Sequence, residues 1–456
     1  MFHADSFKEK LRLFVMILWP IMLTQVMMYS MNIVDTMMAG RAGTNDLAGV
    51  AIGGSLWMPV FTGMNGILLS TSTIIAHLMG KKQSGHVHHA VMQALYLAVM
   101  LTVLVIAFGA FVLDPVISLM ALEDSVHVVS FHYLVGMSFG ILPLFLFTVL
   151  RYFFDGQGFT RITMHILFLT LPVNFFFNYV LIFGQFGFPE LGGIGAGYAT
   201  AITYWFMFIA GIVMTFKVET VRRYKLFVRW VKPSWRAFRE QLSIGVPMGL
   251  SLFFEASIFA VVTLLIGVMF STVTIAANQV VLNFTSLLFM VPLSISMALT
   301  IVVGFSVGGN RIRAAKSYSW IGVVGGTGFL MIGAVFLFFF REQIAYLYTD
   351  NPEVVSIAMV LFIIAIIYQI SDALQSSLQG VLRGYKDVTL PFYIAFISYW
   401  LIGLPIGYAL AAWTELGPVG FWIGITLGLT SAAAGFYFRL RILLRRYPDE
   451  DTAPSQ

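Results

Sequence analysis

The chain has 456 residues, of which 59% are hydrophobic and only 10% are charged, and its mean hydropathy is +0.89. Charged residues make up about 25% of an ordinary soluble domain, so this composition excludes a soluble globular protein and indicates a membrane protein throughout. The absence of cysteine from the sequence excludes disulfides, thiolate metal sites and thiol nucleophiles.

Twelve mostly apolar runs are each long enough to span a membrane. The first continues to Val34, which is too long for the apolar core of a cleaved signal peptide. Six spans are predicted near residues 12–39, 47–77, 89–113, 126–150, 162–184 and 191–216. Six more follow near 241–268, 272–307, 317–340, 354–382, 388–412 and 417–438. The chain therefore divides into an N-lobe (1–216), a basic cytoplasmic linker (217–240), a C-lobe (241–441) and a cytoplasmic tail (442–456).

The basic residues are distributed very unevenly over the connections between these spans. The two ends and the even-numbered connections take 24 of the 26 Lys and Arg residues, whereas only Arg41 and Arg341 fall in odd-numbered connections. Because cytoplasmic segments carry the excess of positive charge, both termini are predicted to lie in the cytoplasm, with the protein in the inner or plasma membrane. The charge of +5 is then explained by topology and contacts with anionic lipid, not by nucleic acid as a partner.

The two halves of the chain resemble each other. Pro20 in LWPIML corresponds to Pro247 in GVPMGL at an offset of 227, and LGGIG from Leu191 corresponds to LGPVG from Leu416 at an offset of 225. Near-constant offsets indicate duplication. Since six spans per half is an even number, the halves have the same orientation. The predicted fold is an all-α polytopic membrane protein, with twelve helices in two parallel six-helix lobes around a central cavity.

Two acidic residues lie in the middle of predicted C-lobe spans. Glu255 is near the centre of its span, and Asp372 follows Tyr368 by four residues, which places both on one helix face. An ionised carboxylate at the bilayer centre costs at least about 2.5 kcal/mol, so such residues are usually functional. Glu255, Asp372 and Tyr368 form a candidate oxygen site for Na⁺; without a metal, burial and like charge favour a bound proton. The alternative is a buried pair that serves packing alone.

A third acid, Asp35, lies nearer the outer end of its span, where an interfacial position beside Arg41 is an equal alternative. Asn174 and Asn178 are one helical turn apart and are expected either to bond a neighbouring helix or to form an N-lobe polar site with Asp35 and Thr200. Every other Asp or Glu can be placed in a loop or tail.

Other motifs give no sign of catalysis. The histidines of HVHH, His86, His88 and His89, lie in a predicted cytoplasmic loop without neighbouring acids and are interpreted as solvated. The sequence contains no GxxxxGKS/T, HExxH or GxSxG motif, so neither an ATP-driven pump nor a familiar hydrolase is supported. No enzyme activity and no cofactor are expected.

Nearly the whole chain resembles the multidrug and toxic compound extrusion (MATE) family, in its NorM branch. The resemblance is carried by VDTMMAGR at Val34, SLFFEAS at Ser251, YQISDALQ at Tyr368 and LRGYKDVTLPF at Leu382. It implies an antiporter in which Na⁺ or H⁺ moves inward while an organic, mainly cationic drug moves outward. It also implies coupling roles for Asp35, Glu255, Tyr368 and Asp372, with Asn174, Asn178 and Thr200 around Asp35. ANQV at Ala277 departs from the AHQV common in relatives.

Alternatives from other classes remain open at this point. A flippase for a lipid-linked precursor or an uptake symporter would share the architecture, and an intramembrane acid-base enzyme would also use the carboxylates. The expected partners are small organic cations, a monovalent cation and membrane lipid, and the expected oligomeric state is a monomer.

Overall fold

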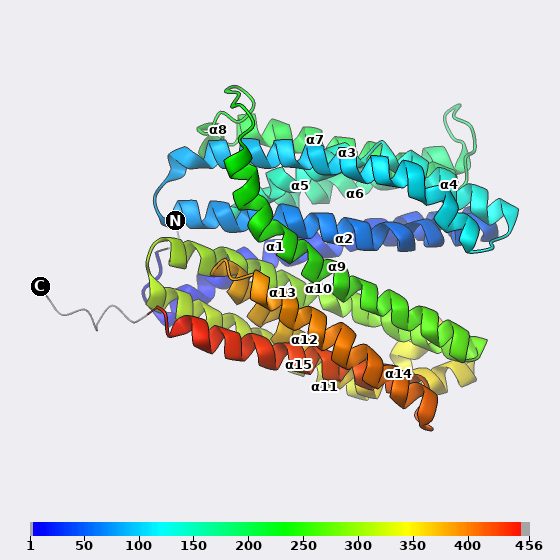
Figure 1. The fold of residues 1–456 in the computed structure, drawn as a ribbon. Helices are drawn as coiled ribbons and strands as arrows, with labels where there is room; N and C mark the ends of the chain where they lie inside the picture. The colour runs from blue at the N-terminus through cyan, green and yellow to red at the C-terminus, as the bar shows by residue number, and fades with distance from the viewer. Residues whose placement is uncertain (1–2, 448–456) are drawn as a thin grey trace, which may run out of the picture. The chain divides into compact units, whose positions relative to one another are not determined.

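A computed structural model describes residues 3–447, so residues 448–456 of the predicted tail lie outside the described part. All regular elements of the described residues are helices (Figure 1). In the first half they are α1 (Phe7–Ala42), α2 (Thr44–Gly80), η1 (Ser84–His86), α3 (Val87–Leu119), α4 (Asp124–Ser138), α5 (Ile141–Gly156), α6 (Thr160–Phe183), α7 (Gly193–Lys217) and α8 (Glu219–Arg222). In the second half they are α9 (Trp235–Met269), α10 (Thr272–Gly308), α11 (Ile312–Tyr348), α12 (Pro352–Gly384), α13 (Thr389–Phe396), the π-helix η2 (Ile397–Gly403), α14 (Leu404–Trp413) and α15 (Pro418–Leu444).

The predicted twelve-span, all-α architecture is confirmed. Eleven continuous helical segments of the described chain are long and apolar enough to cross a membrane. The pair α4 and α5, bent by 51° at its break, passes the same test of length and composition when taken together, which brings the number to twelve. A side chain at Gly140, in this break, would place its Cβ 2.6 Å from the Ala201 Cα of α7. The bend therefore lies where two helix backbones approach too closely for any residue but glycine.

The described chain forms two compact units. The first, Trp19–Gly249, contains most of α1, all of α2 to α8 and the start of α9. Within it, α4 packs against both α2 and α7, and α6 packs against α7. The start of α9 also belongs to this unit: a Cβ on Gly245 would lie 2.6 Å from the carbonyl oxygen of Ile67 on α2. This close backbone contact joins α9 to α2 without an intervening side chain.

The second unit consists of the described residues before Trp19 and after Gly249. Its central element is α12, which packs against α10, α11 and α15 (Figure 1). Local sequence sets the start of α12, because Pro352 occupies the first turn and the side chain of Asn351 accepts a hydrogen bond from the Glu353 amide at 3.0 Å. Three packed neighbours leave most of the C-terminal half of α12 buried, including the polar residues described next.

Candidate functional site

The second unit brings Glu255 of α9 and Asp372 of α12 to the same buried side chain. Their exposed fractions are 7% and 3%, and both accept hydrogen bonds of 3.0 Å from Nε2 of Gln375. Gln375 is fully buried and follows Asp372 by one helical turn. One uncharged amide group thus links two carboxylates from different helices.

The carbonyl end of the same glutamine is also fixed. Tyr399 donates a hydrogen bond of 2.8 Å to Oε1 of Gln375. Tyr399 lies in η2, and such π-helical turns alter the direction of side chains and occur often at functional sites. A cavity of about 10 Å³, room for about one water molecule, borders Glu255 and Tyr399. The site is therefore tightly packed, with little free space.

Tyr368 lies within electrostatic range of both carboxylates. Its ring makes edge contacts with Phe259 of α9, at a centroid distance of 6.0 Å, and with Trp422 of α15, at 5.6 Å. These two contacts fix the ring of Tyr368, which the sequence placed on the same helix face as Asp372.

Arg383 was counted as a loop residue from the sequence, and that placement is wrong. It lies in the last turn of α12 with only 3% of its surface exposed, and its charge acts on Glu255. When both carboxylates are ionised, Glu255, Asp372 and Arg383 together carry one net negative charge. A single monovalent cation or proton would balance that charge.

The described residues contain no group of three or more His, Cys, Asp or Glu side chains arranged to hold a metal ion. The oxygen donors around Glu255 include the Asp372 carboxylate and the phenols of Tyr368 and Tyr399. Such oxygen donors suit a hard cation such as Na⁺ better than a transition metal.

The first unit contains a separate buried acid. Asp35 of α1 is 6% exposed, and its Oδ1 accepts hydrogen bonds from Nδ2 of Asn178 at 2.6 Å and of Asn174 at 3.2 Å. Thr200 of α7 donates to Oδ2 at 2.8 Å. Asp35 is thus buried in the helix bundle, and the structure brings it together with Asn174, Asn178 and Thr200. Two helices, α6 and α7, supply its hydrogen bonds, which satisfy the buried carboxylate.

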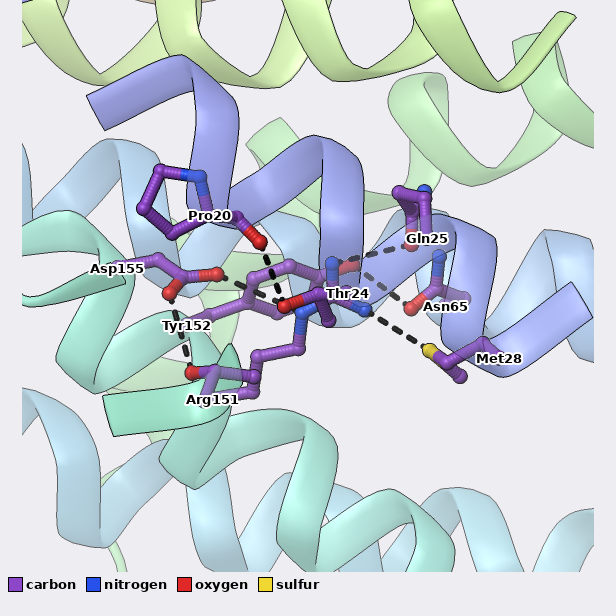
Figure 2. A network of polar contacts seen from close by, with 9 residues as sticks. Pro20, Thr24, Gln25, Met28, Asn65, Arg151, Tyr152 and Asp155 are labelled. Carbon is purple, nitrogen blue, oxygen red and sulfur yellow. Dashed lines mark hydrogen bonds and ion pairs between the residues drawn. The ribbon is translucent and has the colours of Figure 1, made fainter. Parts of the chain in front are cut away.

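A third buried polar cluster was not predicted from the sequence. Figure 2 shows Arg151 of α5 beside Asp155 on the same helix and beside Gln25 and Met28 of α1. The Arg151 Nε and Asp155 Oδ2 atoms are 3.5 Å apart, and Thr163 donates to Oδ1 of Asp155 at 3.2 Å.

The expectation that every remaining acid lies in a loop or tail is therefore wrong for Asp155, and Arg151 does not lie in a loop. Both side chains are about 96% buried. The predicted span ended at residue 150, whereas α5 continues to Gly156. The spacing of Arg151 and Asp155 by four residues, which favours an ion pair on one helix face, was the signal available in the sequence.

The basic connection between α8 and α9 is fixed to the first unit. We call residues 223–234 the strap. His88 Nδ1 lies 2.8 Å from the carbonyl oxygen of Tyr224, and Tyr96 donates to the carbonyl of Val231 at 2.6 Å. His88 is therefore not a solvated loop residue, because it lies in the first turn of α3 and contacts the strap.

Comparison with known proteins shows which family contains this fold. The MatE family model matches twice, over residues 20–180 and 247–409, and its two starts are 227 residues apart. Proteins called "Probable multidrug resistance protein NorM" are similar to this chain along nearly its whole length. The one from Geobacillus kaustophilus is 49% identical and the one from Halalkalibacterium halodurans 47% identical, each match covering 97% of both chains.

Solved structures show the same fold at lower identity. The crystal structure of the eukaryotic MATE transporter AtDTX14 superposes with a TM-score of 0.84 at 20% identity, covering 97% of this chain and all of that one. The Vibrio cholerae MATE transporter VcmN in its bent form superposes with a TM-score of 0.86 at 18% identity, covering 97% and 99%. The repeated family match and the full-length similarity to relatives lead to one conclusion: this chain belongs to the MatE family of membrane transporters.

Proposed function

We propose that this protein is an antiporter that exports organic, mainly cationic, drugs and is driven by inward movement of Na⁺ or H⁺. The observation that supports it most directly is the buried cluster of Glu255 and Asp372 near Arg383. With both acids ionised, these three residues carry one net negative charge, which matches one monovalent cation. The relatives named as multidrug resistance proteins support the assignment of drugs as cargo.

The coupling mechanism follows from the energetics of the buried acids. A ligand shifts an equilibrium between outward-open and inward-open states only through its different affinity for the two states. Cation binding at Glu255 and Asp372, or protonation of Asp35, would remove an uncompensated buried charge and so stabilise the state that releases drug outward. Drug release to the outside is thereby linked to cation entry.

The protein acts as a monomer in the inner or plasma membrane, with both termini in the cytoplasm and the exposed basic strap against anionic lipid. Among the described residues the buried arginines are Arg151 and Arg383, and each acts on a carboxylate. They therefore do not favour a free cationic pocket for the phosphate of a lipid-linked precursor.

The test is ethidium efflux from proteoliposomes that contain the purified wild-type protein. A Na⁺ gradient and a pH gradient are imposed separately. Efflux under at least one gradient is the expected result, and the effective gradient identifies the coupling ion. Absence of efflux under both gradients would contradict the proposal and favour a flippase.

A further inference from the structure

The amide nitrogen of Gln375 lies at the position that a bridging cation would take. It is 3.0 Å from Oε1 of Glu255 and 3.0 Å from Oδ1 of Asp372. The hydrogens of this group carry partial positive charge, so it stabilises both carboxylates. A cation that bridges the same two oxygens has to displace it.

The orientation of this amide is fixed by its surroundings. Tyr399 donates to Oε1 at 2.8 Å, while the nitrogen faces two carboxylate acceptors and the hydroxyl of Ser376 at 3.0 Å. A flipped amide would turn its carbonyl oxygen toward the carboxylates, where two acceptors would face a third. The hydrogen-bond network therefore holds the donor end against the acids.

The ionisable groups around the amide lie on α9, α12 and η2. Glu255 is on α9, Asp372, Tyr368 and Arg383 are on α12, and Tyr399 is on η2. Arg383 is the cation of this set, and its charge acts on Glu255 and on Tyr399. One unit of negative charge is left for the neutral amide to stabilise, which it does only in part because it carries no net charge.

We propose that Gln375 is a built-in competitor of the coupling cation. In the cation-free state its amide bridges Glu255 and Asp372, and cation binding moves it aside. This inference rests on the proposed function, in which Glu255 and Asp372 bind the cation. Because binding breaks the amide contacts, Gln375 lowers cation affinity, and its return to the carboxylates assists release of the cation.

The small cavity beside Glu255 and Tyr399 is consistent with this exchange. It is lined by Ile258 and Phe259 of α9, by Gly403 of η2 and by Gly428 of α15. Its small volume lies beside one of the two carboxylates that the amide bridges.

The experiment measures binding of radioactive Na⁺ to the purified full-length protein at constant pH. The variant Gln375→Leu removes the amide at similar volume and is expected to bind Na⁺ about tenfold more tightly, the equivalent of one hydrogen bond to a charged group. The matched control is Gln369→Leu on the same helix. Gln369 is 5% exposed, and its amide has no hydrogen-bond partner among the described residues, so its Na⁺ affinity should equal that of the wild type.

Each outcome decides for or against the competitor role. Tighter Na⁺ binding by Gln375→Leu supports it, as does binding by this variant when the wild type binds none. Unchanged affinity, or weaker affinity as for a Na⁺ ligand, overturns it and leaves the proposed function intact. Absence of Na⁺ binding in both proteins overturns the inference together with a Na⁺ site at Glu255.

A second variant covers the case in which Gln375→Leu does not fold. Tyr399→Phe removes the hydrogen bond that holds Oε1 of Gln375 but keeps the amide donors. We expect a smaller increase in Na⁺ affinity, because the amide is then less firmly held. A decrease in affinity, or no change, in this variant would also overturn the inference.

Discussion

Arg151 and Asp155 form a buried ion pair within one turn of α5, with Nε and Oδ2 3.5 Å apart. Arg151 also donates to Oε1 of Gln25 at 3.1 Å, so the pair connects α5 to α1 (Figure 2). Removal of one partner leaves the other charge buried without compensation, which typically costs about 3–5 kcal/mol. We therefore expect Arg151→Met to lower the thermal midpoint of the detergent-purified protein strongly.

The matched control is the double variant Arg151→Met with Asp155→Leu, which removes both charges. Its thermal midpoint should lie much closer to that of the wild type, since apolar replacement of a whole buried pair is often tolerated. Equal destabilisation by the single and double variants would show that the charges of this pair are not the source of the effect.

Asp35 is expected to act through its charge and not through its shape. Asp35→Asn keeps an oxygen that accepts from Asn174 and Asn178, and Thr200 also donates to the carbonyl of Ala196. The variant should therefore fold with a near-normal thermal midpoint but lose drug efflux driven by a pH gradient. Efflux at the wild-type rate in this variant would remove Asp35 from the coupling mechanism.

Gln93 is predicted to hold the strap. Its Nε2 donates to the carbonyl of Lys232, and its Oε1 accepts from the amide of Ser234, each at 2.8 Å. Loss of two hydrogen bonds worth about 1 kcal/mol each should raise the open population of the strap at least tenfold. Gln93→Leu should therefore accelerate tryptic cleavage after Arg229 by a similar factor.

The control for this measurement is Gln83→Leu, at an exposed residue before η1. It should leave the cleavage rate unchanged. An unchanged rate in Gln93→Leu as well would show that the strap opens without breaking the Gln93 contacts.

The parts of the structure that follow from local sequence were predictable. Hydropathy and the position of basic residues locate each span without reference to the other spans. The spacing of Asn174 and Asn178 placed both residues on one face of α6. The approach of Asp35 to these amides joins residues 139 apart in the chain. The residue pattern left this contact as one of two alternatives, and the resemblance to a known family favoured it.

Two features were missed in the pattern of residues. Gln375 was one of several polar residues in its span, and its role depends on Glu255, 120 residues away, and on Tyr399 in a π-helical turn. The position of Asp155 was missed because Arg151 looked like the end of a span. The helix α5 continues past residue 150 with both residues buried, because the charges of Arg151 and Asp155 compensate each other.

The central claim is that the charge of Glu255 couples cation entry to drug export. Its most direct test is ethidium efflux from proteoliposomes with Glu255→Gln, under whichever gradient drives the wild type. The new amide oxygen can still accept from Gln375, so the variant should fold, bind ethidium and lose gradient-driven efflux. Efflux at the wild-type rate from correctly folded Glu255→Gln would contradict the account.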